Sequence, residues 1–232
     1  MTFELTEKER LEFYRMTQGT PEWLVARRGR VTASRCADVI TKVGKGEKLR
    51  YSGKRYGYLM ELLEEHLTGR AVEHFVSREM EWGIEQQIFA QAAYEMKQGV
   101  SVDDVGLVVH PKNDLFASSP DGLVDSDGLV EFKCPTTRIH LEYLEAGDVP
   151  EEYIPQMNAQ LACLPEREYC DFVSFDPRLP FGLQLFVRRH HRDEERIAEL
   201  ESEVEKFLDE LAQKMQHLTA ARPIVTELTE AK

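Results

Sequence analysis

Residues 120–133 read PDGLVDSDGLVEFK, and this pattern predicts two antiparallel strands joined by a tight turn. The apolar runs on either side are separated by residues 125–128, Asp-Ser-Asp-Gly, a cluster that typically reverses the chain into a hairpin. Because side chains alternate along a strand, Glu131 and Lys133 share one face while Phe132 faces the core. The stretch therefore predicts a hairpin with charged groups on one side.

The predicted strand pairing also brings Asp121 beside Glu131 and Lys133, so that two carboxylates and one amine share a small volume. Two carboxylates in contact repel and raise each other's pKa, and a divalent cation removes that cost. Mg²⁺ prefers oxygen ligands, is commonly held by one or two carboxylates, and completes its shell with water and phosphate oxygens. The cluster predicts metal-assisted phosphodiester hydrolysis, with a lysine that orients the water. Taken singly, an Asp-Gly turn or a Glu-x-Lys strand is more often ordinary turn chemistry or a solvated face.

These residues resemble the PD-(D/E)XK nuclease superfamily, and within it the phage lambda exonuclease and YqaJ-type viral recombinase family. The similarity is greatest in SPDGL, residues 119–123, followed by EFKCP, residues 131–135. Weaker blocks follow the order and spacing of the family: Trp23 with Arg27 and Thr32-Ala33-Ser34, Trp82-Gly83, Tyr153 with Gln156, and Phe175-Asp176-Pro177-Arg178. The resemblance spans most of the chain.

The resemblance implies a role for each residue of the predicted pocket. Asp121 and Glu131 correspond to the metal carboxylates, and the backbone carbonyl of Phe132 to a third protein ligand. Lys133 corresponds to the lysine that positions the attacking water. Gln156 resembles the glutamine that supports the active site in the family. The implied cofactor is Mg²⁺, with Mn²⁺ as a possible substitute.

A binding site for the 5′-terminal phosphate of DNA is also implied. Arg27 and Ser34 match positions that bind this phosphate in the family. The N-terminus of a helix that starts near Thr32 would add anion affinity.

One position departs from the family. The family pattern is Trp-Gly-x-x-x-Glu, in which the glutamate adds an acidic group to the metal site, whereas this chain has Gln87. Glu85 lies two residues earlier and points roughly 200° away on a helix, so it is a poor substitute. Gln87 can hydrogen-bond a metal-bound water but adds no negative charge. We therefore expect weaker occupancy of any second metal site.

Charge is distributed unevenly along the chain. The formal net charge of the 232 residues is -13, which by itself argues against nucleic-acid binding. Residues 21–55, however, contain ten basic and three acidic residues, a local net charge of +7. A basic segment on an acidic body can contact phosphate locally while the rest repels DNA. Within it, residues 42–46 are predicted to form a mobile loop, and such basic loops are more often only solvated.

The four cysteines do not have the spacing of a metal cluster. Only Cys163 and Cys170 are near each other in sequence, and no C-x-x-C pair occurs; the other two are Cys36 and Cys134. We expect free thiols and no iron–sulfur cluster.

Helices and strands alternate along the chain and predict an α/β fold, with a central mixed β-sheet flanked by helices on both faces, as in the restriction-endonuclease-like PD-(D/E)XK core. The chain has enough apolar residues, 42%, for one sizeable core, which predicts a single domain over residues 1–232. The resemblance implies that this is a PD-(D/E)XK exonuclease domain. Helices are expected near 32–41, 54–68, 78–97, 137–146, 150–164 and 192–218, and strands near 105–110, 114–118, 121–125, 129–134, 168–175 and 183–190.

The leading functional hypothesis is a Mg²⁺-dependent 5′→3′ exonuclease on double-stranded DNA that releases 5′ mononucleotides and leaves a 3′ overhang. The resemblance further implies a homotrimeric ring around DNA, a preference for 5′-phosphorylated ends, and a single-strand annealing protein as partner in phage recombination. The sequence has no signal peptide or apolar run of membrane-spanning length, which with the resemblance predicts a phage- or prophage-encoded protein in the bacterial cytoplasm. A PD-(D/E)XK endonuclease and a non-catalytic DNA-end-binding module remain as alternatives.

Overall fold

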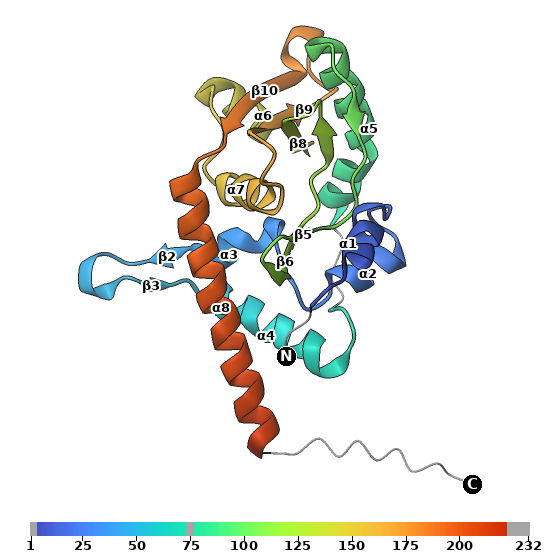
Figure 1. Cartoon of the computed structure of the whole chain (residues 1–232). Helices are drawn as coiled ribbons and strands as arrows, with labels where there is room; N and C mark the ends of the chain where they lie inside the picture. Colours follow the sequence, from blue (N-terminus) through green and yellow to red (C-terminus); the bar gives the residue numbers. More distant parts are fainter. Residues whose placement is uncertain (1–3, 73–76, 222–232) are drawn as a thin grey trace.

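The computed structural model describes residues 4–72 and 77–221 (Figure 1). Residues 1–3, 73–76 and 222–232, which the single-domain prediction also included, lie outside the described part.

The larger sheet has five strands in the spatial order β10-β9-β8-β7-β4. The parallel pair β8–β9 lies in the middle, and every other neighbouring pair is antiparallel, so the sheet is mixed as predicted. The strands are β4 (Val102–Asp103), β7 (Gly122–Val124), β8 (Gly128–Lys133), β9 (Tyr169–Phe175) and β10 (Leu185–His191).

The predicted hairpin is β7–β8, with Gly122 opposite Val130 and Leu123 opposite Leu129. At the turn Asp125 adopts a φ of 47°, a left-handed conformation that Asp tolerates better than most residues. Gly128 lies where the ring of Tyr169 approaches closely, because a Cβ there would stand only 2.4 Å from ring atoms. The turn residues therefore fix both the reversal and the contact with β9.

Helices cover both faces of this sheet, as expected for the fold class. On one face, Val130 and Phe132 of β8 pack with Ala90 and Tyr94 of α5 (Arg78–Gln98). The other face belongs to the largest core cluster, to which β8 contributes Leu129 and the helices α6 (Thr137–Ala146) and α7 (Ile154–Cys163) contribute residues such as Met157. Alternation along β8 therefore directs Val130 and Phe132 to α5, whereas Leu129 and Glu131 lie on the face toward α7.

A smaller sheet of three strands, in the order β1-β6-β5, lies next to the N-terminal helices. Its strands are β1 (Val31–Thr32), β5 (Val108–His110) and β6 (Asn113–Ser118), and the helices are α1 (Glu7–Tyr14) and α2 (Pro21–Arg27). Sequence reasoning anticipated β5 and β6, but the chain leaves this sheet at Ser119-Pro120, before the β7–β8 hairpin of the larger sheet. Proline cannot donate a ladder hydrogen bond, so the two sheets separate at this point.

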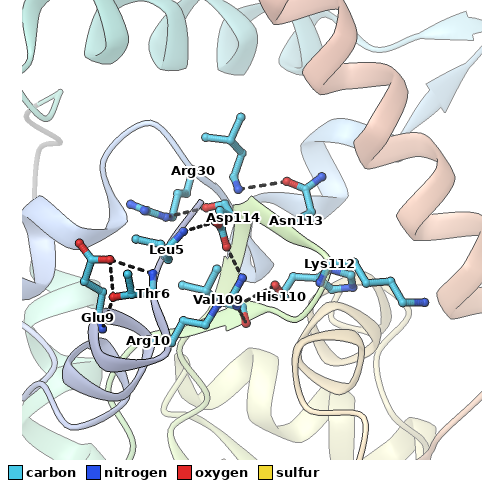
Figure 2. Close-up of polar contacts among 11 residues, drawn as sticks. Leu5, Thr6, Glu9, Arg10, Arg30, Val109, His110, Lys112, Asn113 and Asp114 are labelled. Atoms are coloured by element: carbon cyan, nitrogen blue, oxygen red, sulfur yellow. Dashed lines mark hydrogen bonds and ion pairs between the residues drawn. The ribbon is translucent and has the colours of Figure 1, made fainter. Parts of the chain in front are cut away.

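Polar contacts with Asp114 hold α1 against the β5–β6 hairpin (Figure 2). The Asp114 carboxylate forms an ion pair with Arg10 and accepts a hydrogen bond of 2.6 Å from the backbone N–H of Leu5. Arg10 also donates to the backbone carbonyls of Val109 and His110. The carboxylate and its arginine thus satisfy each other within one network.

The long helix α8 (Glu194–Ala221) packs against α7, α3 (Cys36–Ile40) and α4 (Gly53–Thr68). Its apolar stripe is core packing, since six residues along it are buried: Ile197, Leu200, Val204, Phe207, Leu208 and Leu211. None of the helices in the described part of the chain is long and apolar enough to cross a membrane.

Most predicted elements are present, with some differences. The predicted helix at 32–41 is a 3-10 turn, η1 (Ala33–Arg35), followed by the short α3. The loop predicted over residues 42–46 is part of a two-stranded hairpin, β2 (Lys42–Val43) with β3 (Arg50–Tyr51), joined through η2 (Gly46–Lys48). The remaining 3-10 helix, η3 (Phe181–Leu183), precedes β10.

Candidate active site

The acidic pocket forms where β7 begins and β8 ends. Gly122 pairs with Val130, so the register brings the preceding residue, Asp121, to the level of Glu131. Glu131 is buried, and Lys133 lies on the same side of the strand with its ammonium 2.5 Å from Glu131 Oε1. The sequence-based expectation that these three side chains meet agrees with the geometry.

Four polar groups surround the Glu131 carboxylate. Oε1 accepts hydrogen bonds from Lys133 Nζ and, at 2.6 Å, from the side-chain amide of Gln156. Oε2 accepts a hydrogen bond of 2.5 Å from the side-chain amide of Gln160, one helical turn further along α7. The fourth group is Asp121, whose pKa is raised by the charge of Glu131. The buried carboxylate is thus held by donors from both β8 and α7.

The Asp121 carboxyl lies in a much less favourable environment. Burial, followed by the charge of Glu131, raises its pKa from 3.8 to about 8, although Lys133, the backbone N–H of Phe132 and the Gln87 side chain act in the opposite direction. Oδ2 accepts that Phe132 N–H at 2.7 Å. Burial disfavours the Lys133 ammonium, yet both carboxylates keep its pKa above the usual value. One ammonium therefore faces two carboxylates.

Gln87 reaches this pocket from α5. It contributes a side-chain hydrogen bond to Asp121. Glu85, two residues earlier, is exposed. The position at which the family has a glutamate is therefore in contact with the pocket, and in this chain it carries an amide.

The pocket residues suit a divalent cation. Two carboxylates share one ammonium, and a cation would relieve the repulsion that raises the pKa of Asp121. In an extended strand the N–H and C=O of one residue point to the same side, so the Phe132 carbonyl also points toward Asp121. These are hard oxygen ligands of the kind Mg²⁺ prefers. Within residues 4–72 and 77–221, no cluster of three or more His, Cys, Asp or Glu side chains is placed to hold a metal ion.

Arg27 is linked to this pocket through Ser119. Its guanidinium lies 4.3 Å from the centroid of the Trp23 ring and donates to Ser119 Oγ at 3.4 Å. Trp23 Nε1 donates to the same hydroxyl at 3.1 Å. Burial lowers the pKa of Arg27, and no salt bridge in the described part of the chain neutralises it. Ser119 is two residues before Asp121. The Ser119 hydroxyl therefore connects the partly buried Arg27 guanidinium to the segment that carries Asp121.

Ser34 is not joined to Arg27 by any hydrogen bond between described residues. It is exposed and lies within η1, whose N-cap residue Thr32 makes no side-chain capping bond. The roles predicted for Arg27 and Ser34 in phosphate binding thus remain predictions.

Sequence reasoning missed two residues of this region. Gln160 is buried against Glu131, and its spacing of four residues from Gln156 was the available signal, because residues four apart share one face of a helix. Ser119 was noticed only as part of a motif. Its contact with Arg27 joins segments 92 positions apart, which no local pattern shows.

The four cysteines are free thiols in the structure, and Cys134 is the one that is partly exposed. Cys170 donates a weak hydrogen bond of 3.4 Å to Gln160 Oε1.

Comparison with known proteins shows what the chain as a whole is similar to. A sequence profile described as the YqaJ-like viral recombinase domain matches residues 22–165, well over half of the chain. The crystal structure of an alkaline exonuclease, LHK-Exo, from Laribacter hongkongensis is 42% identical with a TM-score of 0.80, and the match covers 87% of this chain and 97% of that chain. A second structure of LHK-Exo, in complex with dAMP, matches at 43% identity, with the same TM-score and coverage.

A more distant structure shares the fold alone. It is a phage-related exonuclease from Haemophilus somnus 129PT, 17% identical with a TM-score of 0.57, and the match covers 80% of this chain and 96% of that chain. No match to a curated protein was found.

Proposed function

The chain belongs to the YqaJ-like viral recombinase family, and on this premise we propose that it is a Mg²⁺-dependent exonuclease that degrades the 5′-ended strand of duplex DNA to mononucleotides. The family and the alkaline exonuclease it resembles support a deoxyribonuclease role. The observation that carries the finer proposal is the packing of Asp121 and Glu131 against a single ammonium, that of Lys133, in one pocket.

In the proposed mechanism, Asp121, Glu131 and the Phe132 carbonyl would hold Mg²⁺. When bound, the cation supplies Lewis-acid polarisation of the scissile phosphate and a more acidic water. Lys133, which its two carboxylate neighbours keep protonated, orients the attacking water and offsets charge that develops on the phosphate. Gln156 holds the Glu131 carboxylate in place.

The polarity of digestion rests on Arg27. A 5′-terminal phosphate is an anion that a half-buried guanidinium, in salt bridge with none of the described carboxylates, can bind through charge-assisted hydrogen bonds. A strand anchored at this end presents its first phosphodiester to the pocket, so a 5′ mononucleotide leaves and a 3′ overhang remains. The relative LHK-Exo was solved with dAMP, a mononucleotide.

Assembly and partner follow from the family alone. A homotrimeric ring would keep an acidic protein on its DNA for many cycles by enclosing the duplex, and a single-strand annealing protein would take up the overhang. Light scattering of the purified protein checks the ring: we expect the mass of three chains, and the mass of one chain would contradict it.

The central experiment uses linear duplex labelled at one 5′ end, with Mg²⁺ or EDTA. We expect labelled mononucleotides from the unmodified protein with Mg²⁺ and none with EDTA. Asp121→Ala should abolish digestion but retain DNA binding, whereas Asp127→Ala, which removes an exposed carboxylate from the turn of the same hairpin, should digest normally. Unchanged digestion by Asp121→Ala would contradict the proposal.

The alternatives give different results. Closed circular duplex should stay intact, and cutting of this substrate would favour an endonuclease. DNA binding without digestion under any condition would favour an end-binding module.

The phosphate pocket is tested separately with 5′-phosphorylated and 5′-hydroxyl ends. Arg27→Ala should remove the rate advantage of phosphorylated ends. Arg28→Ala is the matched control, because Arg28 is directed away to the carbonyl of Gly69. Equal rates on both kinds of end in the unmodified protein would overturn the assignment.

A further inference from the structure

Gln160 is a fully buried polar residue in the middle of α7, flanked on the helix by apolar residues such as Leu161. Burying an amide costs free energy unless its donors and acceptor are hydrogen-bonded. An apolar side chain could fill this position without the free-energy cost of burying an amide. Its presence therefore calls for a polar partner, and that partner is the carboxylate of Glu131.

The two neighbours of Gln160 fix which way its amide points. The Glu131 carboxylate can only accept hydrogen bonds, so the NH₂ group must face it, at 2.5 Å from Oε2. The thiol of Cys170, itself fully buried, donates to the amide oxygen at 3.4 Å. Rotating the amide by 180° would place two acceptors against each other at Glu131. Cys170 and Glu131 thus select one orientation together.

The hydrogen bonds on Glu131 are divided unequally between its two oxygens. An ionised carboxylate has about four lone-pair sites, two on each oxygen. Lys133 and Gln156 both donate to Oε1, whereas among the described residues Gln160 alone donates to Oε2. Oε2 thus keeps capacity for one further bond, and Gln160 sets the direction in which that capacity points.

From this geometry we infer that Gln160, oriented by the Cys170 thiol, is the positioning residue that aims Glu131 Oε2 at the divalent cation. The inference rests on the proposed function, since it concerns the same pocket. Partners that orient a metal ligand through hydrogen bonds typically contribute about 10–100-fold to metal affinity. Gln160 is not itself a metal ligand or a catalytic residue in this account.

The test is Mn²⁺ binding by calorimetry, without DNA, to the full-length protein and five variants. Gln160→Met keeps the length of the side chain but removes its donors, and should weaken Mn²⁺ binding by about 10–100-fold. Cys170→Ser keeps a donor to the amide oxygen and should bind like the unmodified protein. Cys170→Ala removes that donor and should give a smaller loss than Gln160→Met.

Asn158→Leu is the matched control. Asn158 is another buried amide on α7, but its side chain accepts a hydrogen bond from His190, away from the pocket. Its variant should lose stability without losing Mn²⁺ affinity. A merely structural role for Gln160 predicts the opposite pattern, in which Gln160→Met and Asn158→Leu both lower the thermal midpoint in EDTA and neither changes affinity; this pattern would overturn the inference.

Failure of the inference and failure of the proposed function give different results. If the unmodified protein binds Mn²⁺, Asp121→Asn does not, and Gln160→Met binds normally, the inference alone is wrong. If the unmodified protein binds no Mn²⁺, or Asp121→Asn binds as well as it does, both fail. Should Gln160→Met not fold, a loss of affinity confined to Cys170→Ala, with Cys170→Ser unaffected, supports the inference, and equal affinities in the two contradict it.

Discussion

Asp114 and Asp121 lie seven positions apart and show two opposite ways of burying a carboxylate. Asp114 is paired with Arg10 and accepts a backbone N–H, so its charge is balanced within the α1–β6 network (Figure 2). Asp121 shares one ammonium with Glu131, and burial and that neighbour raise its pKa to about 8. We propose that the balanced group stabilises the fold, whereas the unbalanced group receives a cation.

The largest effect should come from removing the unbalanced charge. Asp121→Asn keeps an oxygen for the Phe132 N–H but removes the charge of a proposed metal ligand, and the cation that it would hold is worth several kcal/mol of transition-state stabilisation. We expect digestion to fall by roughly 10³-fold while the thermal midpoint in EDTA stays equal or rises, since repulsion with Glu131 is lost. Rates on linear duplex and thermal denaturation measure both. A large drop in the midpoint would show that Asp121 is structural.

For Asp114 we expect the reverse, a loss of stability without a loss of digestion. Asp114→Asn removes a charge-assisted contact with Arg10 and should lower the free energy of unfolding by about 2 kcal/mol. Digestion per folded molecule should stay unchanged at a temperature where both proteins are folded. Urea denaturation gives the stability. A specific loss of digestion would break the distinction between the two aspartates.

A third prediction concerns pH, because Mn²⁺ affinity and stability should both change as Asp121 loses its proton. Because the pKa of Asp121 is raised to about 8, a proton must leave before a cation binds at neutral pH. Apparent Mn²⁺ affinity should therefore rise about tenfold between pH 7 and pH 9. Without metal, the folded state keeps this proton between pH 3.8 and about 8 while the unfolded state has lost it, so stability falls as pH rises across that window. In Asp121→Asn the fall should be shallower; an identical slope would contradict the assignment.

The smallest expected effect concerns the amide that replaces the family glutamate. Gln87→Glu adds a third negative charge beside Asp121 and should lower the metal concentration for half-maximal digestion by about fivefold, since ligand charge tunes the affinity of such sites. Glu85→Gln, on the exposed side of α5, is the control. An unchanged metal requirement in Gln87→Glu would remove the idea that Gln87 weakens metal occupancy.

Local patterns predicted the acidic hairpin well, because the Asp-Gly turn and strand alternation are properties of neighbouring residues. The same reasoning missed α1, whose helix buries none of its residues and so shows no apolar periodicity, although Thr6 and Glu9 form a capping box that the sequence displayed. Strand patterns also could not assign β5 and β6 to a second sheet, because the choice of partner strand depends on contacts such as that between Val31 and Phe116. Non-local pairing is not encoded within a window of sequence.

The candidate site also contains residues that local patterns predicted and contacts that these patterns missed. Asp121, Glu131 and Lys133 were found from spacing and alternation. The link from Arg27 to Ser119, and the thiol of Cys170 behind Gln160, depend on how separate elements pack. Only the folded arrangement of α2 and α7 against the sheets shows them.

The central claim is that the pocket of Asp121 and Glu131 holds a divalent cation. Its most direct test is a crystal soaked in Mn²⁺ and measured for anomalous scattering. We predict a peak between the two carboxylates and the Phe132 carbonyl that is absent from Asp121→Asn crystals. An ordered pocket without a peak, with Lys133 still bonded to Glu131 at saturating Mn²⁺, would contradict the account.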